Sequence, residues 1–253
     1  MNRSFHLKIE ENDPAEVPQA STTVRDKYSI GDLTSTMNQK ITFWSREPEK
    51  NVQLEDHLEN DNEFDITGIL NLSCMNVTDS DLPTVVQRAF WAGPKKCTGL
   101  ILRDNSLTAN GVRIVVDTII TGRACLKYLS FSSNPDIGDA GVEHIVRLLQ
   151  KRRSIIFLAL PRTGITDYGV KLLADVLCGT DPDATNPPAL EKLYISFNKG
   201  ITDESIDPLL QILEQNQRLK ILAIQYCSIS DKGYRRLKHA AAKLKKKKFS
   251  LTG

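Results

Sequence analysis

The chain offers few side chains that could act as a nucleophile, a general base or a metal ligand. It contains 5 cysteines and 4 histidines among 253 residues, and no Cys-x-x-Cys pair occurs. The motifs G-x-x-x-x-G-K-[ST], G-x-G-x-x-G, H-E-x-x-H and G-x-S-x-G are also absent. His144 has no Cys or His at ligand spacing and is expected on the surface or in a groove. The sequence therefore indicates no catalytic residue, no cofactor and no metal, and predicts a protein that is not an enzyme.

The side chains best suited to chemistry are instead aromatic residues and an arginine, which suit the recognition of another protein. Tyr and Arg dominate binding hot spots. The candidate partner-binding residues are Tyr128, Phe157, Arg162, Tyr194, Phe197 and Tyr226. The alternative is that some of these rings only pack against their neighbours across strands.

These candidates recur because the chain repeats itself from residue 66 onward. A leucine-x-leucine core, in which Phe or Ile can take the second place, returns after 30, 29, 29, 35 and 29 residues. It occurs at Leu70-Asn-Leu72, Leu100-Ile-Leu102, Leu129-Ser-Phe131, Leu158-Ala-Leu160, Leu193-Tyr-Ile195 and Leu222-Ala-Ile224. An Asn, Thr, Cys or Met and then an aliphatic residue follow each core, and a Ser/Thr-Asp pair commonly marks a helix start. Each of the six units therefore predicts a short strand, a turn and a helix, and stacking the units would make one continuous core.

The pattern LxxLxLxx(N/C/T)xI resembles the ribonuclease-inhibitor-like class of leucine-rich repeats, which also forms the sensor region of NOD-like receptors. The resemblance covers about residues 66–245. It implies an α/β fold, a curved solenoid of about six repeats with a parallel concave sheet and convex helices. Alternation along each strand then places the six candidate residues on the concave face or just after it.

The expected domains are an acidic, largely disordered segment over 1–60, a leucine-rich-repeat domain over 61–245 and a basic tail over 246–253. Residues 1–66 hold 14 acidic and 7 basic residues. Within the first segment, a capping element is expected near 41–60, where Ile41-Thr-Phe-Trp44 either covers the first repeat or is a peptide ligand for another protein.

The basic tail is a second candidate site, for an anionic surface. Residues 232–253 contain 9 basic residues and no acidic one, and Lys245, Lys246, Lys247 and Lys248 are consecutive. The tail favours a solvated cap, with a localisation signal or membrane-surface contact as the alternative and nucleic acid as the least favoured partner. The chain has no apolar run long enough to cross a bilayer. We expect a cytoplasmic protein, with the nucleus as the alternative.

Three local features lead to expectations of their own: an insertion, a proline and three cysteines. The insertion from Gly179 to Pro188 is expected to be an exposed loop, either neutral or in contact with a partner. Pro161 cannot donate to a strand ladder and predicts a local break in the sheet. Cys97, Cys125 and Cys227 fall at or beside core positions and are expected to be buried and structural.

The favoured function is a non-catalytic interaction module or scaffold that binds a protein of unknown identity on its concave face. One alternative is a regulatory adaptor or a cytoskeletal or ciliary structural component. Another is a GTPase-activating protein similar to the Ran activator, for which Arg103 and Arg162 are the only arginines at strand ends.

Overall fold

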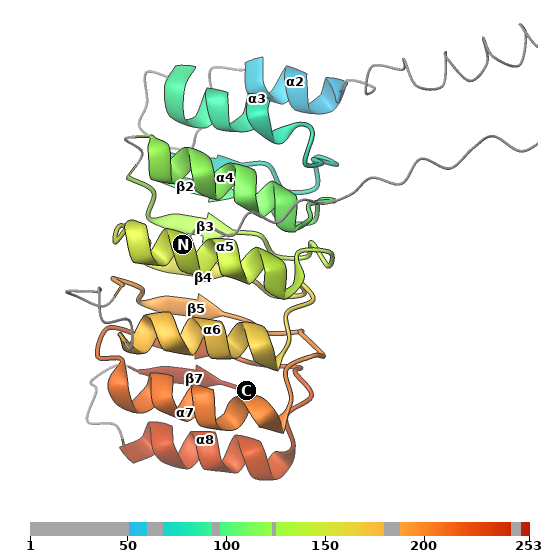
Figure 1. The fold of residues 1–253 in the computed structure, drawn as a ribbon. Helices are drawn as coiled ribbons and strands as arrows, with labels where there is room; N and C mark the ends of the chain where they lie inside the picture. Colours follow the sequence, from blue (N-terminus) through green and yellow to red (C-terminus); the bar gives the residue numbers. More distant parts are fainter. Residues whose placement is uncertain (1–50, 60–67, 93–96, 123–124, 180–187, 244–248) are drawn as a thin grey trace, which may run out of the picture. The chain divides into compact units, whose positions relative to one another are not determined.

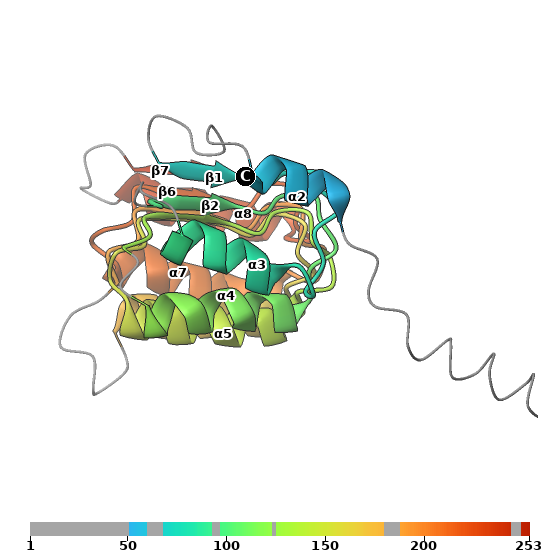
Figure 2. The same ribbon diagram turned by 90° about the horizontal axis from the view of Figure 1, so that it is seen from above.

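In the computed structural model, residues 51–59, 68–92, 97–122, 125–179, 188–243 and 249–253 are described. These residues form one parallel sheet of seven strands in chain order, with helices along one face (Figures 1 and 2). The strands are β1 (Ile69–Asn71), β2 (Gly99–Ile101), β3 (Tyr128–Ser130), β4 (Phe157–Ala159), β5 (Lys192–Tyr194), β6 (Ile221–Ala223) and β7 (Ser250–Thr252). The helices are α2 (Val52–Glu59), α3 (Leu82–Gln87), η1 (Arg88–Ala92), α4 (Ala109–Thr121), α5 (Gly138–Lys151), α6 (Asp167–Cys178), η2 (Asp203–Ser205), α7 (Ile206–Gln215) and α8 (Asp231–Lys243). The predicted α/β solenoid of strand–turn–helix repeats is confirmed.

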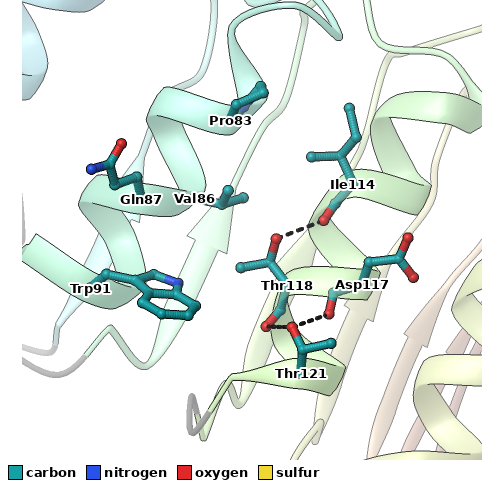
Figure 3. A pocket seen from close by; sticks show the side chains of 8 residues that line it. All are labelled: Pro83, Val86, Gln87, Trp91, Ile114, Asp117, Thr118 and Thr121. Carbon is teal, nitrogen blue, oxygen red and sulfur yellow. Dashed lines mark hydrogen bonds between the residues drawn. The ribbon is translucent and has the colours of Figure 1, made fainter.

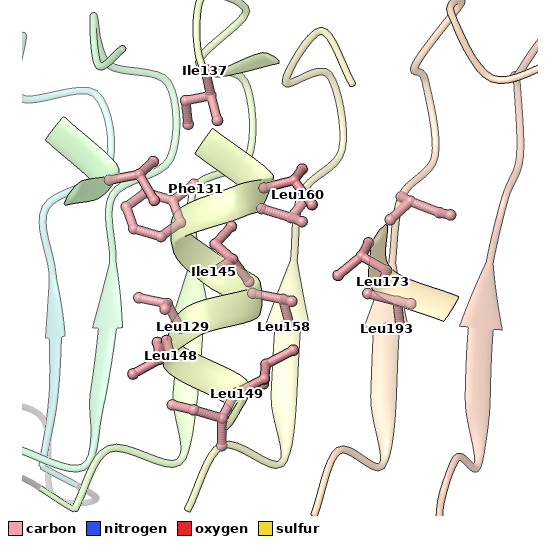
Figure 4. Packing of buried hydrophobic residues seen from close by; sticks show 14 of the residues in the cluster. Leu129, Phe131, Ile137, Ile145, Leu148, Leu149, Leu158, Leu160, Leu173 and Leu193 are labelled. Atoms are coloured by element: carbon pink, nitrogen blue, oxygen red, sulfur yellow. The ribbon is translucent and has the colours of Figure 1, made fainter. Parts of the chain in front are cut away.

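The core lies between the sheet and the helices. The first leucine of each predicted pair stands opposite its counterpart in the next strand, so that Leu100, Leu129 and Leu158 are in register, and all three are fully buried. Figure 4 shows Ile145 and Leu148 of α5 reaching toward this strand layer. Burial of each such side chain contributes about 1.5–3 kcal/mol, so the apolar periodicity of the sequence determines which face every element turns inward.

A ladder of buried asparagines, each a few residues after the end of a strand, joins consecutive units. Asn134 Nδ2 donates to the carbonyls of Leu102 and Phe131, both at 2.9 Å, and its Oδ1 accepts from the Leu107 amide at 3.0 Å. Asn105 and Asn198 make the equivalent bonds. The side chain thus satisfies buried backbone groups of two units, which explains why an amide is favoured there.

A second ladder joins the starts of the helices. An aspartate in one unit accepts the backbone N–H and the hydroxyl of a Thr or Ser in the next, at 2.7–3.0 Å and 2.5–2.7 Å respectively. The pairs are Asp79 with Thr108, Asp139 with Thr166, Asp167 with Thr202, and Asp203 with Ser230. The hydroxyls of the three threonines also accept a backbone N–H two residues on, as the sequence predicts for an N-cap. The aspartate therefore links units, in addition to any interaction with its own helix dipole.

Glycine is required in the first turn of several helices because the aspartate of the preceding unit occupies the space of a side chain. A Cβ on Gly169 would lie 2.4 Å from Asp139 Oδ1, and one on Gly111 would lie 2.2 Å from Asp79 Oδ1. The carboxylate is therefore the group that approaches the helix backbone most closely at these two glycines.

The two ends of the described array differ from the simple repeat. At the first, α2 buries Leu54 and Leu58 in the core, and Asn51 Nδ2 donates to the Met75 carbonyl at 2.8 Å. The segment Ile41–Trp44 lies outside the described residues. At the other end, residues that the sequence assigns to a tail form β7, which pairs with β6. Leu251 alone carries the repeat pattern there, so the seventh strand was not predicted.

Two local expectations are wrong, one for Pro161 and one for Cys125. The sheet does not break at Pro161. The amides of Leu160 and Arg162, on either side of it, donate to the carbonyls of Tyr194 and Ser196 in the next unit, at 2.8 and 3.1 Å. Pro161 itself accepts a bond from the Ser133 amide at 2.8 Å, so the ladder tolerates a residue without an N–H at this place.

Cys125 is exposed, whereas Cys97 and Cys227 are buried as expected. Leu126, one residue further on, is fully buried and takes the core position in that unit. Burial raises the pKa of the Cys227 thiol. Within the insertion, residues 180–187 lie outside the described residues.

Candidate protein-binding surface

The candidate surface is the face of the sheet opposite the helices, hereafter the open face. Figure 2 shows α4, α5 and α7 on the other side of the strands. Because Leu129, Leu158 and Leu193 of the strands point into the core, their immediate neighbours point to the open face. These neighbours include Tyr128, Phe157 and Tyr194, as the sequence predicts.

Three of the candidate rings form what we call the strand cluster: Tyr128, Phe157 and Tyr194. The centroids of Tyr128 and Phe157 are 6.1 Å apart, and those of Phe157 and Tyr194 are 5.2 Å apart, with tilted planes. All three side chains are half-buried. Such pairs contribute about 0.5–1.5 kcal/mol beyond their buried area. The expected cross-strand packing is therefore present, and it leaves part of each ring accessible.

The other three candidates form what we call the rim cluster, Arg162, Phe197 and Tyr226, just beyond the strands. The rings of Phe197 and Tyr226 stack at 4.6 Å with an interplanar angle of 22°. The guanidinium of Arg162 lies over the Phe197 ring at 5.6 Å. Phe197 is 42% and Tyr226 is 64% exposed. Among the described residues, no ring contact joins the rim cluster to the strand cluster, so the candidates form two groups.

The rim cluster belongs to a row of residues with an unusual backbone conformation, which we call the rim row. Each unit places one non-glycine residue there with φ between 52° and 62°, namely Cys74, Asp104, Ser133, Arg162, Phe197 and Tyr226. Only Gly, and to a lesser degree Asn and Asp, adopts this left-handed region readily. The sequence places Arg162, Phe197 and Tyr226 at or just after the strands but does not predict their left-handed backbone. The only indication of it was that one such position follows the strand in every unit.

A second apolar surface lies on the helix side, between α3 with η1 and α4 (Figure 3). A groove of about 480 Å³ is lined by Val86, Trp91, Ile114 and Thr118, among others. Trp91 is 68% exposed, and it lies in η1, a π-helical turn. Sequence reasoning missed this groove, since an exposed tryptophan cannot be told from a buried one by spacing alone.

The remaining candidates are the lysines of the basic tail and the other strand-end arginine. Lys245–Lys248 lie outside the described residues. Arg103 pairs with Asp104 at 3.0 Å, which leaves Arg162 as the strand-end arginine without a carboxylate partner among the described residues. Burial lowers the pKa of His144, and the neighbouring Arg147 adds to this effect.

The described part of the chain contains neither a metal-binding cluster nor a membrane-spanning helix. No group of three or more His, Cys, Asp or Glu is placed to hold a metal ion there. None of the helices described has the length and apolar character needed to cross a bilayer.

Comparison with known proteins agrees with this geometry. A family model described as Leucine Rich repeat matches residues 124–146. The mouse NACHT, LRR and PYD domains-containing protein 14 is 29% identical over 150 residues, which are 59% of this chain and 14% of that protein. The Caenorhabditis briggsae protein phosphatase 1 regulatory subunit 37 homolog is 24% identical over 165 residues, which are 62% of this chain and 16% of that protein. The matched stretches thus span only a small part of either relative.

Proposed function

Because the chain is a leucine-rich-repeat protein, we propose that it is a non-catalytic interaction module that binds a partner protein on its open face. The strand cluster and the rim cluster form the contact surface. The relatives support an interaction role in general terms, since one is named as a regulatory subunit of a phosphatase. The identity of its partner does not transfer to this chain.

One observation carries the proposal: bulky side chains occupy consecutive places of the rim row. A left-handed conformation costs a non-glycine residue about 1–2 kcal/mol. Asn or Gly would avoid much of this cost at Arg162, Phe197 and Tyr226. Strain of this kind tends to gather at functional sites. The exposed, stacked rings of Phe197 and Tyr226 are therefore better explained by recognition than by folding.

The backbone conformation also provides an experiment that separates binding from folding. The double variant Phe197→Asn/Tyr226→Asn removes both rings and places a residue that tolerates the left-handed region at each position. The lost stacking, about 0.5–1.5 kcal/mol, is offset by the relieved backbone. We expect a thermal unfolding midpoint close to that of the natural chain.

Binding is measured with a partner identified by proximity labelling in the native cell and then purified. The double variant should weaken its affinity by about 30-fold or more, since truncation of a single hot-spot residue costs about 2 kcal/mol or more. The matched control is Trp91→Ala/Tyr168→Ala, which removes two exposed aromatic side chains from the helix side. If the control abolishes binding while the rim variant retains it, the partner docks on the helix side and the proposal is wrong.

A further inference from the structure

We infer that the segment bound on the open face is acidic, with carboxylates on either side of an apolar residue. This inference rests on the proposed function, because it names the chemistry of the partner at the same surface. It follows from the charges that the strands and the rim row present, and from where those charges lie relative to the aromatic rings.

The charged side chains of this surface have one sign. From β3 to β6, the strands and the rim row contain two charged residues, Lys192 and Arg162, and both are cations. Among the described residues, no carboxylate forms an ion pair with either. Glu191, next to Lys192, is paired with Lys220 at 2.7 Å. The positive charge on this surface is therefore not neutralised from within the described part of the chain.

The two cations lie at opposite ends of an apolar patch. Lys192 stands opposite Phe157 in the sheet, and Arg162 follows Phe157 by five residues. At about 3.3 Å per residue, this places them about 16 Å apart along the strand direction. Tyr194 and the small Ala159 are paired between them. An extended segment covers this distance in about five residue steps, and its side chains on one face recur every second residue. Two acidic residues about four or six positions apart, with an apolar side chain on the same face between them, therefore match the surface.

Each cation suits a carboxylate. Arg162 has a planar guanidinium with several donors, which can bind a carboxylate through two parallel bonds while its face stays on the Phe197 ring. Lys192 is half-buried, and its ammonium group can bind a carboxylate as a compact point charge. Both features favour recognition of a fixed pair of acidic side chains.

A nucleic-acid ligand suits this surface less well. Single strands bind to open aromatic faces along a track of several cations. Here the faces of Phe197 and Tyr226 are already stacked on each other at 4.6 Å, and Arg162 lies over Phe197. Two cations at this spacing also make a short track. Peptide carboxylates need only the two fixed positions.

The test is selection of peptides from a displayed library of random dodecapeptides against the full chain. We expect enrichment of sequences with two acidic residues about four or six positions apart and an apolar residue on the same face between them. The affinity of a synthetic representative is measured by fluorescence polarisation. Arg162→Glu/Lys192→Glu should weaken it by about tenfold, since attraction becomes repulsion at both ends. The matched control Lys151→Glu/Lys171→Glu has the same change in net charge at exposed positions on α5 and α6, and it should leave the affinity within about twofold.

The outcomes separate this inference from the proposed function. If selected peptides lose binding in Phe197→Asn/Tyr226→Asn but are not acidic, or are unaffected by charge reversal, the acidic partner is refuted while the surface stands. If no selected peptide depends on the aromatic residues, or none is selected, both ideas fail. Tighter binding of a fluorescent oligothymidylate than of any peptide, lost on charge reversal, would replace the peptide with nucleic acid and overturn the inference.

Discussion

Replacing Gly169 by alanine tests whether the aspartate–hydroxyl contact fixes the spacing of the helices. In an isolated helix this change is stabilising by about 1 kcal/mol, because glycine is the poorer helix former. In this protein the new Cβ would lie 2.4 Å from Asp139 Oδ1, a distance that forces the carboxylate to move. The two effects have opposite signs, so the measured stability shows which one is larger.

The hydrogen bonds of Asp139 give the size of the unfavourable effect. Its carboxylate accepts the amide and hydroxyl of Thr166 at 2.8 and 2.5 Å, and the Gly169 amide at 3.1 Å. A hydrogen bond to a charged group is worth about 1.5–3 kcal/mol net. Losing two of the three bonds, each taken at the lower value of about 1.5 kcal/mol, costs about 3 kcal/mol. After the helix gain of about 1 kcal/mol, we expect Gly169→Ala to lower the free energy of unfolding by about 2 kcal/mol.

Urea unfolding followed by circular dichroism measures this change, and a double-mutant cycle identifies its cause. In the Asp139→Ala background the carboxylate is gone, and the next neighbour of the new Cβ is Val142 Cγ2 at an ordinary 3.4 Å. Gly169→Ala should then become stabilising by about 1 kcal/mol. The reasoning is refuted if the alanine destabilises equally in both backgrounds, or stabilises the natural chain.

Other predictions concern the asparagine ladder, the last helix and the thiols. Asn134→Ala should lower the free energy of unfolding by about 3 kcal/mol or more, because buried backbone groups lose their partners, and urea unfolding would detect it. Tyr234→Phe should cost about 1 kcal/mol, since the hydroxyl donates to the Ile224 carbonyl at 2.6 Å. Burial raises the pKa of Tyr234 above its ordinary 10.0, so its protonated form stabilises the fold below pH 10.0 and this contribution is lost as the pH rises through the raised pKa. The natural chain, compared with Tyr234→Phe, should therefore lose extra stability above that pH. A thiol reagent should react quickly with exposed Cys125 and slowly with buried Cys97, and equal loss of the fast phase in Cys125→Ser and Cys97→Ser would contradict the structure.

Most of the fold could be predicted because the apolar residues that recur in each repeat are the residues that form the core. Leu100, Leu129 and Leu158 recur at nearly constant spacing and lie in register. A residue type that recurs in one place of every unit has one structural role, and six copies make that role evident. The seventh strand was missed because its unit offers a single clear match, Leu251, at the limit of what a pattern can show.

The features that the sequence did not predict depend on contacts between side chains of different units. Periodicity shows that Asp139 and Thr166 each recur, but not that one accepts the protons of the other. Cys125 is exposed because the next residue, Leu126, occupies the core position in that unit. Of the candidate surface, the six residues could be named, whereas their division into two clusters follows from ring positions that only the packed sheet determines.

The rim row also affects how this surface can change over time. The backbone takes the same left-handed conformation with Cys, Asp, Ser, Arg, Phe or Tyr at this position, so the fold accepts side chains of different chemistry there. Six such places recur, one per unit, at Cys74, Asp104, Ser133, Arg162, Phe197 and Tyr226. Their side chains can change while the leucines beneath stay unaltered, although neighbours in contact, such as Phe197 and Tyr226, are coupled to each other. The array is thus a scaffold on which specificity can diverge, or be engineered, one unit at a time.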